Sequence, residues 1–157
     1  MIPTRFLFHL AEYEGIAIEW LRLDHIHGVY AHTPGMKRPV IVLSEELHNN
    51  ERELRCVLSH ELGHHFCTAG NHAIAANIID HPYAAKLERL ATKWAVEHLI
   101  PTDVFFQCIV DGMDGQDLAD YFCVTHDYIK FKSELIQRDE RYSAALSELR
   151  ARYNVVF

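Results

Sequence analysis

Long hydrophobic runs are missing from this sequence, and their absence excludes one class of protein. Even the apolar stretch at residues 73–79 contains Asn77 and falls far short of the roughly 18 residues that are needed to span a bilayer. The first ten residues hold no apolar core long enough for a signal peptide, and no small-residue cleavage site follows them. We therefore expect a protein that does not partner with a membrane and that works in the cytoplasm.

Close cysteine pairs and an excess of basic residues are also missing. Cys56 and Cys67, the two nearest cysteines in the sequence, are 11 positions apart, which matches neither a zinc knuckle nor a redox motif. Lysine and arginine together number 15 against 22 acidic residues, so the formal net charge is −7. This balance argues against nucleic acid or an anionic lipid surface as a partner.

Repeats, low-complexity segments and flexible linkers are absent as well, so nothing in the sequence marks a domain boundary. The chain has 157 residues, of which 49% are hydrophobic and 24% are charged, as in an ordinary globular protein. We expect a single domain over residues 1–157. Within it, residues 1–101 are expected to form a sheet with two long helices, and residues 102–157 a helical subdomain.

The hydrophobic periodicity predicts an α+β fold that begins with a helix and a small sheet. A helix is expected at residues 3–14, followed by strands at residues 16–20, 28–32 and 40–43. The Pro34-Gly35 pair between the last two strands predicts a hairpin turn. Together these segments predict a small antiparallel sheet of about three strands, which would pack on the helix that follows.

Helical periodicity dominates the rest of the chain. One long helix is expected from a cap at Asn50 to a stop at Gly70, and a second between Pro82 and Pro101. The predicted core stripe of the second helix consists of Leu87, Leu90, Trp94 and Leu99. Shorter helices are expected from a cap at Thr102, at residues 116–122, from residue 125 onward and at residues 139–153.

The first long helix contains His60-Glu61-Leu62-Gly63-His64, which is an H-E-x-x-H motif. Two histidines four residues apart lie on one face of a helix, so both imidazoles can reach one metal ion while Glu61 flanks the same site. With 12 histidines in the chain, composition alone gives roughly 0.07 accidental matches. The motif falls on the most periodic helix, and this context favours a metal site with Glu61 as its general base.

A catalytic zinc site needs a third protein ligand, and the second long helix offers two candidates. Glu97 lies four residues after Lys93, which suits an exposed ion pair. Glu88 has no basic residue three or four positions away and shares a strip with Ala84, Ala91 and Ala95, whose small side chains permit close helix packing. We favour Glu88 as the third ligand and keep Glu97 as the alternative.

Two further residues of the motif region have structural interpretations. Gly63 costs a helix about 1 kcal/mol relative to alanine, and the usual compensation is close approach by another backbone or by a substrate. His65 follows the motif directly, so its side chain is turned about 100° away from that of His64. We therefore interpret His65 as a packing or supporting histidine and exclude it from the ligand set.

The sequence also resembles the ImmA/IrrE metallopeptidase family, from about Ala11 to about Arg138. The similarity is carried by Val40-Ile41-Val42-Leu43, by residues 52–65, by Glu88-x-x-Ala91-x-x-Trp94-Ala95 and by Leu99-Ile100-Pro101. The resemblance implies a zincin-like fold of the gluzincin type, with Zn²⁺ held by His60, His64 and Glu88 and with Glu61 as the general base. It also implies a cytosolic protein substrate, such as a helix-turn-helix repressor of a phage or mobile element.

Zinc would lower the pKa of a water molecule, and Glu61 would take the proton and return it to the departing amine. A further donor is needed for the oxyanion, and Tyr30, His72, His81 and Tyr83 are candidates among which spacing does not decide. If residues 40–43 form an edge strand beside the motif helix, an extended substrate would add to that strand through backbone hydrogen bonds.

Two other functions remain open at this point. The first is a zinc module that binds a repressor or toxin without hydrolysis. The second is DNA binding through residues 116–138, where Leu118-Ala119-x-x-Phe122-x-Val124-Thr125-x-x-x-Ile129 resembles the core of a helix-turn-helix. Charge argues against DNA binding, because residues 116–157 carry six basic and seven acidic side chains.

Overall fold

The computed structural model describes residues 2–67 and 81–153. The described chain divides into two compact units, one from Ile2 to Ala95 and another that begins at Val96. The expected helix stop at Gly70 lies outside the described residues. The expectation of one domain over residues 1–157 stays a prediction, and the two units are described separately below.

The first unit contains a sheet of β1 (Ala17–Leu21), β2 (Gly28–Ala31) and β3 (Val40–Ser44), in the order β1-β3-β2. The predicted hairpin is confirmed, because β2 pairs antiparallel with β3. The prediction of an antiparallel sheet is wrong for the other pair, since β1 runs parallel to β3. The chain reverses direction twice between β1 and β3, and residue alternation within a strand does not encode such a path.

This strand order also corrects the expected edge. Because β3 lies between β1 and β2, residues 40–43 form the central strand and have no free edge. The edge strands are β1 and β2. Any extended segment that adds to this sheet would therefore pair with one of those two strands.

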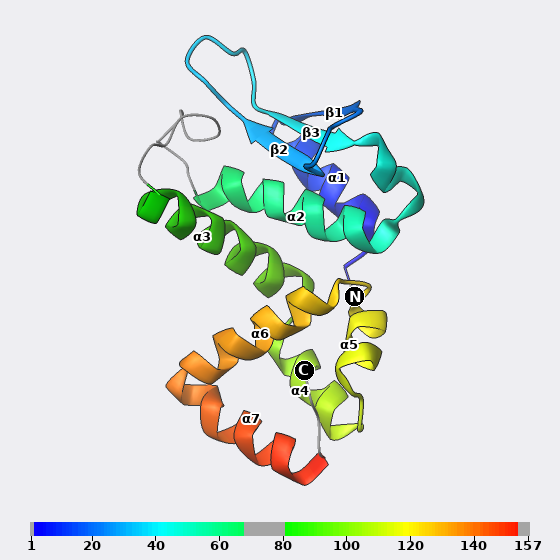
Figure 1. Cartoon of the computed structure of the whole chain (residues 1–157), viewed down its shortest axis with the longest axis vertical. Coiled ribbons are helices and arrows are strands. Elements are labelled where there is room, and N and C mark those ends of the chain that lie inside the picture. Colours follow the sequence, from blue (N-terminus) through cyan, green and yellow to red (C-terminus); the bar gives the residue numbers. More distant parts are fainter. Residues whose placement is uncertain (1, 68–80, 154–157) are drawn as a thin grey trace. The chain divides into compact units, whose positions relative to one another are not determined.

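Helices α1 (Thr4–Tyr13) and α2 (Glu51–Cys67) pack on each other and on the sheet, and a short 3-10 helix (Glu45–Asn49) leads into α2 (Figure 1). Asn50 caps α2 as predicted, because its side-chain oxygen accepts the Glu53 backbone N–H at 3.2 Å. Arg55 is only 1% exposed and donates to the Ile2 carbonyl at 2.6 Å, which ties α2 to the residues before α1. The fully buried apolar residues of this unit include Leu7, Ala11, Ile41, Leu43, Leu58 and Leu62.

Helix α3 (His81–Leu99) corresponds to the predicted second long helix, and its buried face differs in part from the expected one. Leu87 and Leu99 are buried as predicted, whereas Leu90 is 36% exposed. Ala91 and Ala95 are fully buried instead. The small residues face inward because they allow the closest packing, and this rotation of the helix turns Leu90 outward.

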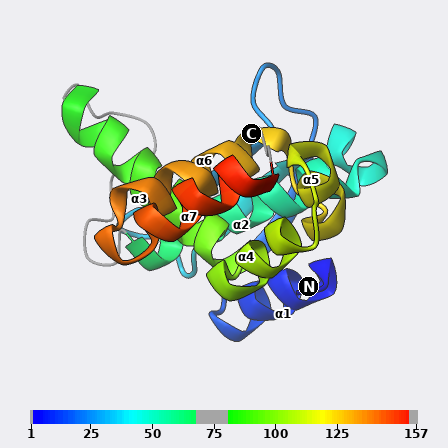
Figure 2. The ribbon, with the colours of Figure 1, turned by 90° about the horizontal axis from the view of Figure 1, so that it is seen from below.

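The second unit contains α4 (Thr102–Val110), α5 (Gly115–Phe122), α6 (His126–Arg138) and α7 (Glu140–Tyr153). Helices α6 and α7 lie side by side (Figure 2), and α5 packs on α6. The buried apolar residues here include Phe105, Ile109, Leu118, Phe122, Ile129 and Leu146. These elements confirm the mostly helical second half and, with the sheet, the α+β class.

The ends of these helices show which capping expectations hold. Thr102 does not cap α4, because Pro101 precedes the first turn and the Thr102 hydroxyl instead accepts a hydrogen bond from Lys132 Nζ at 2.8 Å. Asp114 caps α5 in a capping box with Asp117. Cys123 ends α5 in the left-handed conformation, with φ of 51°. None of the described helices is long and apolar enough to cross a membrane.

Candidate metal centre

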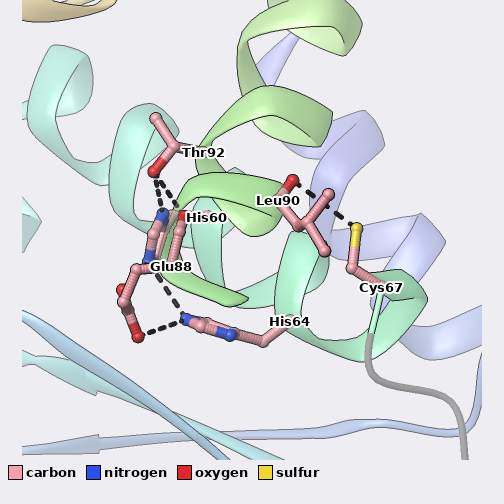
Figure 3. Close-up of polar contacts among 6 residues, drawn as sticks. All are labelled: His60, His64, Cys67, Glu88, Leu90 and Thr92. Atoms are coloured by element: carbon pink, nitrogen blue, oxygen red, sulfur yellow. Dashed lines mark hydrogen bonds and ion pairs between the residues drawn. The ribbon is translucent and has the colours of Figure 1, made fainter. Parts of the chain in front are cut away.

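The candidate site begins with the two histidines of the motif on α2. His60 and His64 are one helical turn apart, with their ring centroids 4.7 Å from each other and their planes at 87°. Their side chains are 22% and 14% exposed. Their Nε2 atoms are 3.1 Å apart, so the two imidazoles converge on one point (Figure 3).

Glu88 reaches the same point from α3. Its Oε2 lies 3.1 Å from His60 Nε2, and its Oε1 lies 3.4 Å from His64 Nε2. Among the described residues, these three make up the group of side chains able to hold a metal ion. Glu97, the alternative acidic candidate on α3, is not part of that group.

Close packing of the two helices brings Glu88 within reach of the histidines. A Cβ added to Gly63 would clash with the Ala91 backbone, standing 2.9 Å from its Cα and closer still to its carbonyl oxygen. The expectation that Gly63 accommodates another backbone is therefore confirmed. A second contact between the two helices is the stacking of the Phe66 and Trp94 rings, with 4.9 Å between their centroids.

The three side chains fit a zinc ion in donor chemistry and in spacing. Imidazole nitrogen and carboxylate oxygen are both common zinc ligands, with bonds of about 2.0–2.1 Å. Tetrahedral bonds of that length place neighbouring donor atoms about 3.3 Å apart. The observed separations of 3.1, 3.1 and 3.4 Å agree with this value.

The electrostatics of the cluster keep Glu88 ionised. Hydrogen bonds to His60 and His64 hold the pKa of the Glu88 carboxyl far below its usual range, and burial opposes this only in part. Burial lowers the pKa of His64, but its hydrogen bond to Glu88 and the charges of Glu61 and Glu88 outweigh burial, so the pKa is raised overall. A charged acceptor thus faces two imidazoles, which is an arrangement that attracts a cation.

Glu61 lies beside this cluster in a different environment. It is only 6% exposed, and burial raises the pKa of its carboxyl even though His60, His64 and a hydrogen bond from the Tyr30 backbone N–H act in the opposite direction. A Cβ added to Gly28 would stand 2.9 Å from Glu61 Oε1. Edge strand β2 therefore packs tightly over the carboxylate, and a carboxyl with a raised pKa is suited to accept and release a proton.

Thr92 was not among the residues expected from the sequence, yet it links the two helices of the candidate site (Figure 3). Its hydroxyl donates to the Glu88 carbonyl at 2.8 Å, so its oxygen is left to accept from His60 Nδ1 at 3.3 Å. If Nε2 binds a metal ion, the ring proton of His60 lies on Nδ1, where the Thr92 oxygen can accept it. The sequence offers one signal for this role of Thr92, because Thr92 is four residues after Glu88 and therefore lies on the same face of α3.

The candidate oxyanion donors have different positions. The Tyr30 hydroxyl lies 3.1 Å from His65 Nδ1. Tyr83 is 38% exposed, while His72 and the side chain of His81 lie outside what the structure describes. His65 also lies 3.5 Å from Glu14 at its other ring nitrogen, so it supports the site's surroundings and is not part of the ligand cluster, as expected.

Two imidazoles and a carboxylate on adjacent helices, with a buried glutamate between the histidines in sequence, are features of the H-E-x-x-H metallopeptidases. A family model for the IrrE N-terminal-like domain of the M78 peptidases matches residues 11–134. The chain belongs to this family of metallopeptidases, which confirms the resemblance noted in its sequence. Neither the curated proteins nor the solved structures that were compared include a match.

Proposed function

We propose that this protein is a zinc-dependent endopeptidase that cleaves a specific protein in the cytoplasm. The observation that carries the proposal is the convergence of His60, His64 and Glu88, with their donor atoms within 4.8 Å of one another, beside the buried carboxylate of Glu61. Membership of the M78 peptidase family supports the same reaction class.

In this proposal His60, His64 and Glu88 hold the zinc ion and Glu61 acts as the general base. When bound, zinc supplies Lewis acidity that makes a water molecule more acidic and polarises a peptide carbonyl. Glu61 accepts the proton of that water as the peptide bond is attacked, and it then returns the proton to the departing amine nitrogen. Glu61 is only 6% exposed, so bulk water has little access to its carboxyl while it holds the proton.

We further propose that the substrate is a helix-turn-helix repressor of a phage or mobile element. This part of the proposal rests on the family resemblance. A protein substrate is consistent with a peptidase family, and narrow specificity is consistent with action among other cytoplasmic proteins.

The test is co-expression of the protein with any helix-turn-helix repressor that is encoded next to its gene, followed by a search for fragments. Wild type is expected to produce fragments, and Glu61→Gln is expected to abolish them while the purified variant still binds zinc. Glu97→Gln is the matched control, because it makes the same change of side chain at a glutamate of α3 that is outside the ligand group. Zinc binding without fragments in the wild type would instead favour a module that binds its partner without cleaving it.

DNA binding through α5 and α6 has less support. Lys132, one of the basic residues of that segment, is only 2% exposed and its Nζ donates to Thr102. It therefore has no access to a phosphate group, and the remaining charge of the segment does not favour a DNA backbone.

A further inference from the structure

Helix α3 carries a row of basic residues beside the candidate metal centre. Lys86, Arg89 and Lys93 are all exposed, and they lie three and four positions apart, so they share one face of the helix. Arg89 directly follows Glu88 in the sequence, and the Glu88 side chain is 61% exposed. The metal centre is therefore open to solvent next to these three residues, which we call the basic row.

The basic row contrasts with the charge of the rest of the protein. The chain has a formal net charge of −7, whereas the row holds three basic residues, and Glu97 is the one acidic residue of α3 on the same face. Like charges three or four positions apart repel each other and weaken a helix. A local arrangement that opposes stability is expected where it serves a function.

The length of the basic row fits a short segment of a bound polypeptide. Lys86 and Lys93 are seven residues apart, which corresponds to about 10 Å along the helix axis. An extended peptide covers that distance with about three residues. Carboxylates in such a segment would meet ammonium and guanidinium groups, whereas lysine or arginine side chains would be repelled.

We propose that Lys86, Arg89 and Lys93 form a binding surface for an acidic segment of the substrate, within about four residues of the scissile bond. The inference rests on the proposed function, because it assumes that a polypeptide is cleaved at the metal centre. The negative charge of the rest of the chain repels acidic proteins, so attraction is confined to segments that reach the basic row. This combination of attraction and repulsion is a source of narrow specificity.

The experiment uses the zinc-loaded full chain and two quenched fluorescent peptide pools. One pool carries Asp or Glu at two fixed neighbouring positions, and the other carries Asn or Gln there. We expect wild type to cleave the acidic pool with a kcat/KM about fivefold higher at low ionic strength. Added salt is expected to remove most of this difference, because it screens exposed charges.

Variants of the basic row test which residues carry the preference. Lys86→Gln/Arg89→Gln is expected to lose it, while cleavage of the Asn/Gln pool and zinc affinity stay within about twofold of wild type. Lys86→Glu/Arg89→Glu is expected to prefer a third pool with Lys or Arg at the fixed positions. Arg5→Gln/Arg22→Gln is the matched control, because it removes the same charge from exposed residues of α1 and of the segment after β1.

Three results would overturn the inference. The first is cleavage by wild type at low ionic strength without a preference for the acidic pool. The second is a preference that persists in Lys86→Gln/Arg89→Gln, and the third is an equal loss of preference in the control variant.

Peptide binding separates failure of this inference from failure of the proposed function. If wild type binds no zinc and cleaves no pool in a Glu61-dependent way, the proposed function fails. Fluorescence anisotropy of the labelled pools with Glu61→Gln measures binding without turnover. Tighter binding of the acidic pool than of the Asn/Gln pool would still support the basic row as a surface for acidic segments, and equal binding would overturn it.

Discussion

Gly63 and Ala91 bring the two ligand-bearing helices into backbone contact, with no room for a single methyl group between them. This contact fixes the separation between the imidazoles of α2 and the carboxylate of α3. We therefore expect the binding of a metal ion between the two helices to depend on Gly63, although Gly63 has no side chain to bind it.

Gly63→Ala tests this dependence. The added methyl group has to push against main-chain atoms of α3, so we expect a loss of about 1–3 kcal/mol of unfolding free energy, despite the better helix propensity of alanine. Zinc affinity is expected to fall with it, because Glu88 moves away from the histidines. Denaturant unfolding and chelator competition measure the two effects.

Gly35→Ala is the control for that variant. Gly35 has a φ of +98° and nothing within 4 Å of an added Cβ, so alanine there strains only a loop. It is expected to lower stability and to leave zinc affinity unchanged. If both variants reduce zinc affinity equally, packing against Ala91 is not what positions the ligands.

Thr92→Val is expected to weaken zinc binding about 10- to 100-fold, because the variant keeps the shape of threonine and removes the acceptor of His60 Nδ1–H. Thr92→Ser restores the hydroxyl and should bind zinc nearly as well as wild type. Chelator competition gives the affinities, and ¹⁵N chemical shifts of His60 report the tautomer. An unchanged tautomer and affinity in Thr92→Val would contradict this account of the His60 ring.

Cys123 ends α5 with a left-handed backbone that costs most residues about 1–2 kcal/mol. We therefore expect Cys123→Gly to stabilise the protein by about 0.5–1 kcal/mol, which is less than the full strain because glycine also loses more backbone entropy. Cys123→Ala removes the same sulfur and keeps the strain. Thermal unfolding should rank glycine above alanine, and the opposite order would show that the Cys123 side chain outweighs its backbone.

We expect His98 to contribute to the loss of folding stability in acid. Burial lowers the pKa of His98 in the folded protein from its ordinary value of 6.5. As pH falls below 6.5 the unfolded chain takes up the proton before the folded protein does, so stability is lost between 6.5 and the lowered folded pKa. His98→Gln should lose less stability than wild type between pH 7 and pH 5, as measured by denaturant unfolding at each pH.

The sequence predicted local features well because they depend on local spacing. His60 and His64 were placed on one helix face by their four-residue separation, and Glu88 was preferred to Glu97 because of its small neighbours. The structure brings those three residues together. The α+β class followed from the change of periodicity that begins at Asn50.

Features that depend on distant pairing were missed. The parallel pairing of β1 with β3 requires knowledge of the chain path, and no residue of β1 encodes it. The spacing of the large apolar residues of α3 predicted that Leu90 lies in the core. The close contact between Gly63 and Ala91 instead turns the alanine side of α3 inward and leaves Leu90 partly exposed. The contact of Tyr30 with His65 joins residues 35 positions apart, which spacing alone does not reveal.

The hydrogen bond from Arg55 to the Ile2 carbonyl limits how far this end of the protein can be trimmed. Removing the residues before Thr4 would take a charged hydrogen bond from a guanidinium that water hardly reaches, at a cost of about 1.5–3 kcal/mol. The loss would destabilise α2, the helix that carries His60 and His64. A shortened preparation is therefore expected to bind zinc more weakly, although it keeps every side chain of the candidate metal centre.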